Sequence, residues 1–75
     1  MKHPGTITFV DGLTGETTSV APVEEIDPEL RFLPGADGRL RPVVRVEITT
    51  EGDHRTLREF GPGDELLRST FQRRE

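Results

Sequence analysis

Glycines and prolines divide the apolar residues of this chain into short runs. The sequence holds 8 glycines and 6 prolines, and most of them fall between the apolar runs. Both residue types interrupt regular elements and mark turns. The runs themselves are rich in β-branched and aromatic residues. This pattern predicts several short strands joined by turns, and therefore a mainly β domain.

The domain is small, and its core must be small as well. A chain of 75 residues buries only about 60% of the surface that its unfolded form exposes, and such a core rarely contributes more than ~3–5 kcal/mol. There are no cysteines, so disulfides and thiolate metal sites are excluded. Hydrophobic residues make up 31% of the chain and charged residues 32%. We expect one folded domain, residues 1–75, whose stability can depend on a partner.

The chain is acidic, and its charge is unevenly distributed. The formal net charge is −4 at pH 7, which gives no general attraction to nucleic acid or to an anionic membrane. Residues 1–29 carry one lysine against six acidic residues, whereas residues 30–75 carry nine arginines against eight acidic residues. Arginine is favoured at protein interfaces, although a GC-rich genome would enrich it as well.

No segment has the character of a membrane span or a signal peptide. No apolar run approaches the ~20 residues that cross a bilayer, and the start of the chain, MKHPGTITFV, has no apolar core or cleavage-site pattern. The absence of cysteine fits a reducing compartment. We expect a cytoplasmic protein, or one inside a protein or phage assembly, with no membrane partner.

The first half contains a predicted hairpin. Residues 6–10, TITFV, alternate apolar and polar side chains, which predicts a strand. The segment DGLTGE (residues 11–16) is a predicted turn whose glycines supply positive φ, and residues 17–23 form a weaker second strand. Pro22 lacks a backbone N–H, so it confines this second strand to a sheet edge or marks its end.

Residues 39–50, RLRPVVRVEITT, are the clearest predicted strand. Apolar residues share one parity and charged residues the other, as in a half-solvated antiparallel strand. The apolar face holds Leu40, Val44, Val46 and Ile48, and the charged face holds Arg39, Arg41, Arg45, Glu47 and Thr49. Pro42 removes one ladder donor, so the strand lies at an edge or is bulged there.

A hairpin joins this strand to RTLREF (residues 55–60). A four-residue loop, EGDH, places Ile48 opposite Leu57 and Glu47 opposite Arg58. This register matches an apolar residue with an apolar residue and an acid with a base.

Residues 24–35 allow two structures. Asp27, Pro28 and Glu29 are typical of a helix start, with an N-cap, a proline at the first helical position and an acid in the first turn. The alternative is a short strand, LRFL, that leads into the turn PGADG. The Asp-Gly pair of that turn is a hairpin signal.

The last segment, DELLRSTFQRRE, is predicted to be a helix. Asp64 is a suitable N-cap, and the arginines near the end of the segment suit the helix dipole. Leu67, Thr70 and Phe71 would then share one stripe. The competing structure is a final strand with Leu67, Ser69 and Phe71 on its inner face.

Together these elements predict a small antiparallel meander or open barrel of about four or five strands with a short C-terminal helix. Residues 1–4 and 72–75 are expected to be short tails.

Two segments resemble ubiquitin. FVDGLTGETTSV (residues 9–20) is similar to the first hairpin of that family, where a Phe-Val strand, a Leu-Thr-Gly turn and a threonine-rich strand follow one another. HRTLREF (residues 54–60) is similar to a later Arg-Thr-Leu segment ahead of an aromatic residue. The resemblance implies, as an alternative, an α+β β-grasp fold and a role as modifier or adaptor. Pro28 and Pro34 lie where the central helix of that family would run, and the chain does not end in Gly-Gly, so conjugation is not implied.

No motif in the sequence supplies the chemistry of an enzyme or a metal site. GLTGETT lacks the Lys-Ser or Lys-Thr pair of a phosphate-binding loop, and Glu16 would repel a phosphate. The acids from Glu24 to Glu29 lack the glycine of a calcium loop, which favours a solvated patch or a docking surface for a basic partner. His3 and His54 have no nucleophile or further ligands at suitable spacing. We expect no catalytic, cofactor-binding or metal-binding residues, and His54 is the best candidate if the protein is an enzyme.

Arginines and apolar anchors are the candidate partner-binding residues. They are Arg39, Arg41, Arg45, Arg58, Phe32, Leu66 and Phe71. Arginine and aromatic side chains anchor the hot spots of protein interfaces. An arginine face could also contact phosphates, but no aromatic residue lies between these arginines to stack on bases.

The sequence therefore predicts a non-enzymatic protein-binding module that docks through a sheet face or edge. Its role would be that of an accessory subunit, a regulator or inhibitor, or a phage structural component, and the partner can be a second copy of the chain. The alternative is a nucleic-acid-binding protein that uses the face of Arg39, Arg41 and Arg45. The net charge opposes that alternative.

Overall fold

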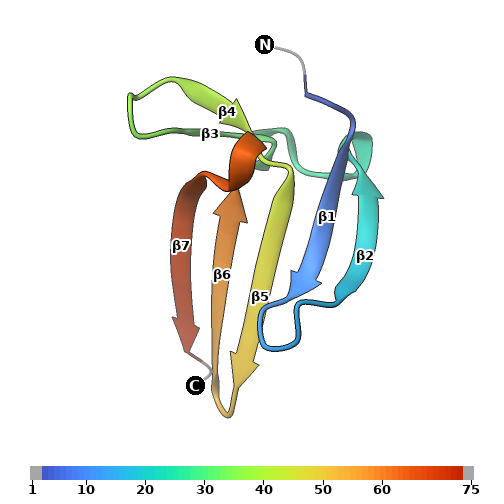
Figure 1. Ribbon diagram of the computed structural model, residues 1–75, viewed down its shortest axis with the longest axis vertical. Helices are drawn as coiled ribbons and strands as arrows, with labels where there is room; N and C mark the ends of the chain where they lie inside the picture. Colours follow the sequence, from blue (N-terminus) through green and yellow to red (C-terminus); the bar gives the residue numbers. More distant parts are fainter. Residues whose placement is uncertain (1–2, 74–75) are drawn as a thin grey trace.

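The computed structural model describes residues 3–73, which form a five-stranded sheet, a two-stranded hairpin and three short 3-10 turns (Figure 1). The sheet contains β1 (Thr6–Asp11), β2 (Thr17–Pro22), β5 (Arg45–Glu51), β6 (His54–Phe60) and β7 (Leu66–Arg73) in the order β2-β1-β5-β6-β7. The hairpin contains β3 (Phe32–Pro34) and β4 (Leu40–Pro42), and the turns are η1 (Val23–Glu25), η2 (Pro28–Leu30) and η3 (Pro62–Asp64). The prediction of a mainly β domain is confirmed.

One parallel strand pair sets the topology. β1 runs parallel to β5, whereas the other neighbours in the sheet are antiparallel. Backbone hydrogen bonds extend this pairing beyond β5 itself, because the Thr8 N–H donates to the Val44 carbonyl at 3.0 Å. Parallel neighbours cannot be joined by a tight turn. Here β2 first returns the chain along the sheet, and residues 23–44, which we call the crossover, then carry it past β1 to the start of β5. The crossover carries η1, η2 and the β3–β4 hairpin, which lies across the top of the sheet in Figure 1.

The predicted first hairpin is confirmed. β2 pairs with β1 and lies at the edge of the sheet, with Pro22 as its last residue. The Asp11 N–H donates to the Glu16 carbonyl at 2.8 Å across the turn, and the Asp11 side chain accepts from the Leu13 N–H at 2.9 Å. Gly15 has a φ of 78°, the left-handed conformation that favours glycine.

The predicted register of the β5–β6 hairpin is also confirmed. Ile48 lies opposite Leu57 and Glu47 lies opposite Arg58. Pairing continues one step further than expected, because Glu51 lies opposite His54. The connecting loop is therefore a two-residue turn.

The prediction of one continuous strand over residues 39–50 is wrong. The chain leaves β4 at Pro42 and enters β5 at Arg45, so the two halves belong to different sheets. Val43, between them, is 1% exposed. Its N–H donates to the Arg31 carbonyl, whereas the N–H of the next residue donates to the Phe60 carbonyl. Because these two donors bond in different directions, the chain changes sheet here.

Residues 24–35 combine parts of both predicted structures. Asp27 caps η2 by accepting a hydrogen bond from the Glu29 N–H at 3.1 Å, and Pro28 is the first residue of that turn. The turn ends at Leu30, and the following residues form β3. Within residues 3–73 there is no α-helix to lie across the sheet. The ubiquitin-like β-grasp alternative, which required one, is therefore wrong.

The predicted C-terminal helix is wrong as well, because this segment is β7. Asp64, the expected N-cap, lies in the turn before it with a φ of 62°. The β6–β7 register shifts where Phe60 lies opposite Leu66 and Glu59 lies opposite Arg68. Leu67 is thus the extra residue of a β-bulge, and it packs against the core. A bulge changes the alternation of side chains, so Leu67 and Thr70 are both half-buried at a spacing that imitates a helix.

The two faces of the sheet differ in how they are covered. Residues directly opposite each other on neighbouring strands share a face. The face that we call the core face carries Ile7, Phe9, Val46, Ile48, Leu57, Glu59, Arg68 and Thr70. The opposite one, the outer face, carries Arg45, Glu47, Thr49, His54, Thr56, Arg58, Phe60, Leu66, Ser69 and Phe71. The crossover residues pack on the core face only.

The core is a cluster of four buried apolar residues. Ile7 and Val46 come from the sheet, and Leu33 and Val43 come from the crossover. Each is exposed by no more than 7%. Phe9, Ile26, Ile48 and Leu67 surround the cluster and are partly buried. The core therefore lies under the crossover and covers only part of the core face.

Truncation of Ile7 should leave little stability. We expect Ile7→Ala to lower the free energy of unfolding by roughly 2–5 kcal/mol, which is comparable with the whole stability of a core of this size. Ile7→Val should cost about 0.5–1.5 kcal/mol, and Val20→Ala, at an exposed position of β2, less than about 0.5 kcal/mol. Urea unfolding followed by circular dichroism would measure all three. Equal losses for Ile7→Ala and Val20→Ala would show that the core is elsewhere.

Candidate functional site

The seven partner-binding candidates do not form one site. Three of them, Phe32, Arg39 and Arg41, lie on or beside the β3–β4 hairpin. The other four, Arg45, Arg58, Leu66 and Phe71, lie on the outer face of the five-stranded sheet. The expected shared face of Arg39, Arg41 and Arg45 does not exist, because the strand that would have carried them is divided between two sheets.

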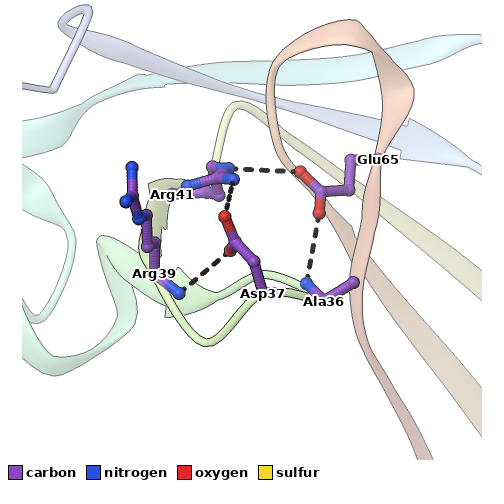
Figure 2. A network of polar contacts seen from close by, with 5 residues as sticks. All are labelled: Ala36, Asp37, Arg39, Arg41 and Glu65. Carbon is purple, nitrogen blue, oxygen red and sulfur yellow. Dashed lines mark hydrogen bonds and ion pairs between the residues drawn. The ribbon is translucent and has the colours of Figure 1, made fainter.

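Arg41 holds the hairpin to the start of β7. Figure 2 shows its guanidinium between two carboxylates, with Nη2 2.9 Å from Asp37 Oδ2 and Nε 3.4 Å from Glu65 Oε1. The other Glu65 oxygen accepts a hydrogen bond from the Ala36 N–H at 3.4 Å. A Cβ atom on Gly35 would come within 2.8 Å of that oxygen. The close fit indicates that Arg41 has a structural role in joining the two sheets.

Asp37 has a perturbed pKa in this network. Its Oδ1 accepts a hydrogen bond from the Arg39 N–H at 3.0 Å, and its other oxygen faces Arg41. The Arg39 N–H, and after it the Arg41 guanidinium, lower the pKa of Asp37 from its ordinary value of 3.8. The Asp37 carboxylate in turn raises the pKa of Arg41. Both effects stabilise the charged pair.

Phe32 belongs to the crossover and packs against His3. It is half-buried, and its ring lies edge-on to the His3 ring with centroids 5.7 Å apart. His3 Nε2 lies 2.6 Å from the Val43 carbonyl oxygen, and the Gly5 N–H donates to His3 Nδ1 at 3.0 Å. His3, assigned to a tail from the sequence, thus contacts the crossover.

Arg45 is also occupied by contacts within the chain. Its guanidinium lies 3.2 Å from Glu47 and 3.1 Å from Asp64, and its Cζ lies 4.3 Å from the centroid of the Phe60 ring. The Nε atom is buried and has no hydrogen-bond partner within residues 3–73. Arg45 therefore packs along the outer face and is not available as a free cation.

Phe71 and its neighbours form an apolar patch at the far end of the outer face. The Phe71 ring is 64% exposed, and the His54 ring lies beside it with centroids 5.4 Å apart. Leu13, from the β1–β2 turn, is 61% exposed. These residues surround a hollow of about 360 Å³ that Thr49 and Thr56 also line. We call this surface, together with Arg58, the outer patch.

Arg58 adds a cation to the outer patch. It is exposed and lines the same hollow. Within the described part of the chain it makes no ion pair shorter than 4.0 Å, although Glu47 lies opposite it on β5. Leu66, 51% exposed, lies further along β7 on the same face. Aromatic, aliphatic and arginine side chains are thus available together on one side of the sheet.

The core face carries a second depression. A groove of about 430 Å³ lies between the sheet and the crossover, with a mainly apolar lining that includes Phe9, Ile26, Leu30, Leu57 and Thr70. Its principal polar feature is an ion pair. Glu59, 7% exposed, accepts two hydrogen bonds from Arg68, at 2.7 and 3.0 Å. The bidentate pair neutralises a carboxylate that would otherwise be buried without a partner.

His54, the histidine with the best claim to a catalytic role, faces two carboxylates. Its Nδ1 lies 3.4 Å from Asp53 Oδ1, and its Nε2 lies 3.9 Å from Glu51 Oε2. Within residues 3–73, no group of three or more His, Asp or Glu side chains could hold a metal ion. The same residues contain no helix long and apolar enough to cross a membrane.

Comparison with known protein families, with curated proteins and with solved structures finds no match to this chain. Arguments about function therefore rest on the surfaces described above.

Sequence reasoning missed Leu13 and His54 as neighbours of Phe71. Leu13 is an apolar residue in a polar turn, which was the available signal. Its approach to Phe71 depends on the order of the strands, because β1 and β7 are separated by β5 and β6. The alternation of residues within single strands does not contain that information.

The Asp37 carboxylate should titrate below its ordinary range. Because its pKa is lower in the folded than in the unfolded state, Asp37 contributes stability above the unfolded pKa and loses it as the pH falls through the folded value. An NMR titration of the Asp37 side-chain carbon should give a midpoint below 3.8. Arg41→Gln should raise this midpoint only part of the way, since the Arg39 N–H remains. A wild-type midpoint at or above 3.8 would contradict the network.

Removing Arg68 should destabilise the fold by leaving Glu59 without its partner. We expect Arg68→Leu to cost roughly 1–3 kcal/mol. The double variant Glu59→Leu/Arg68→Leu should recover most of that loss, because an apolar pair can replace a buried ion pair. Urea unfolding would measure both, with Ser69→Ala as a control at an exposed position of the same strand. A double variant less stable than Arg68→Leu would contradict this account.

Proposed function

We propose that the protein is a non-enzymatic module that binds another protein through the outer patch. The observation that carries this proposal is the position of Phe71. Phe71 is 64% exposed and its ring lies beside that of His54, while Leu13 and Arg58 line the same hollow. Exposed apolar side chains gathered on one face mark interaction sites.

The composition of the outer patch suits protein recognition. Hot spots are enriched in aromatic residues and arginine and lie in the centre of an interface, with polar residues around them. Phe71 and Leu13 supply the apolar anchors, and Arg58 supplies a cation that can pair with a partner carboxylate. Thr49 and Thr56 line the hollow with hydroxyl and methyl groups.

The arginines give less support to nucleic-acid binding. Arg41 and Arg45 each contact two carboxylates of the chain itself, so phosphate would have to compete with those contacts. Protein binding therefore remains the better proposal. Within it we retain the three roles suggested by the sequence, namely accessory subunit, regulator or inhibitor, and phage structural component, in the cytoplasm or inside an assembly.

Substitution of Phe71 should abolish capture of the partner. We expect tagged wild-type protein to retain a specific partner from its native lysate, and Phe71→Ala and Arg58→Ala to weaken that retention by tenfold or more, as hot-spot truncations cost about 2 kcal/mol or more. Gln72→Ala, next to Phe71 but on the core face, is the matched control. The readout is quantitative mass spectrometry of the captured proteins.

Two results would argue against the proposal. One is that wild type and Phe71→Ala capture the same proteins in the same amounts. The other is that Gln72→Ala reduces capture as much as Phe71→Ala does, because that would move the binding site to the other face.

A further inference from the structure

The surface of this chain is larger than its mass requires. It exposes 5243 Å², whereas a folded monomer of 8.4 kDa is expected to expose roughly 4,600 Å². Its radius of gyration of 12.5 Å likewise exceeds the ~11.4 Å of a compact domain of this length.

The core face of the sheet is only partly covered. A sheet with one apolar face needs a second layer. The crossover supplies this layer only around the buried cluster, and beyond it the groove remains open. Leu57 and Phe9 are half-buried in that groove, and Leu30 is 43% exposed. The missing part of the layer must come from outside the chain if it is filled at all.

Charges on the two sides of the groove are opposite in sign. Ile26 and Leu30 line one side, and they belong to a segment whose acids Glu24, Glu25, Asp27 and Glu29 are all exposed. On the other side, the core face of β6 and β7 carries Arg55 and Arg68. Arg55 contacts only the neutral Gln72, at 2.6 and 3.2 Å. The only acid beside these arginines on the same face of β6 and β7 is Glu59, which is already bonded to Arg68.

A second copy of the chain matches both the open apolar lining of this groove and the opposite charges of its two sides. We propose that two copies pack core face to core face around a two-fold axis and form a two-layer sandwich. A two-fold axis brings the same two patches together twice. The acidic segment of each copy then meets the arginines of the other, and the two grooves close over each other. Both outer patches stay free, so the dimer would present two binding surfaces on opposite sides.

A matched pair of variants on β7 tests which face of the sheet forms the dimer interface. Thr70 lines the groove, and Ser69 points to the outer face. We expect the wild type to be a dimer by analytical ultracentrifugation, from low micromolar to submillimolar concentration. Thr70→Glu should raise the dissociation constant by a hundredfold or more, because it opposes the acidic segment in an apolar interface. Ser69→Glu should leave it unchanged. Circular dichroism would verify that both variants fold.

A charge swap tests whether the acidic segment of one copy contacts the arginines of the other. This test does not depend on Thr70→Glu being folded. One variant, Glu24→Arg/Glu25→Arg/Glu29→Arg, makes the acidic segment basic while keeping Asp27, the cap of η2, and the other, Arg55→Glu, makes the arginine side acidic. Each alone should be mainly monomeric, because like charges meet twice. Mixed together they should form a heterodimer, because both contacts are then between opposite charges.

Three outcomes would overturn the proposal. The first is a wild type that stays monomeric up to submillimolar concentration. The second is a dimer that Thr70→Glu and Ser69→Glu affect equally. The third is a pair of charge variants that dimerise separately as well as they do together. None of these readouts involves a partner captured through Phe71, so the dimer and the proposed function can fail independently.

Discussion

The packing of the crossover on the sheet, around Ile7 and Val43, is the constraint on which the rest of the structure depends. Both residues are 1% exposed and belong to one buried cluster. β2 returns the chain to the end of the sheet where β5 begins, and residues 23–44 then carry it past β1 to β5 and pack on one face. Because the crossover residues of the buried cluster pack on the core face, that face has a small core and an open groove. The outer face has no such layer over its side chains.

Charge-assisted contacts join elements of the fold that the small apolar core does not hold together. Arg41 ties the β3–β4 hairpin to Glu65 at the start of β7, and Arg68 neutralises Glu59 on the core face. Arg45 packs on Phe60 between two carboxylates. Three arginines that could have served as binding groups are thus part of the fold. Arg58 has no such contact within residues 3–73, and it lines the hollow beside Phe71.

The bulge at Leu67 determines which side chains of β7 lie on each face of the sheet. It keeps Leu67 against the core and reverses the alternation beyond it, so that Thr70 lies over the groove and Phe71 points to the outer face. If residues 66–71 alternated regularly with no bulge, Phe71 would lie on the face opposite to that of Leu66, which is the core face. The bulge therefore keeps Leu66 and Phe71 on the same face and leaves a small, polar side chain in the groove where we place the second copy.

Sequence alone determined the local structure of this protein. Alternation along β1, β5 and β6, the glycine and proline turns, and the Glu47–Arg58 register depend on neighbours in the chain, and all were predictable. Tertiary structure decided which strands lie together. It separated Arg39 and Arg41 from Arg45, because Val43 is buried under the crossover and the chain changes sheet there. It also turned the helix-like spacing of Leu67 and Thr70 into a bulged strand, because pairing with β6 satisfies the backbone of this segment. Leu13 and Phe71 line one hollow only because of the order of the strands in the sheet, and no periodicity within a strand records that order.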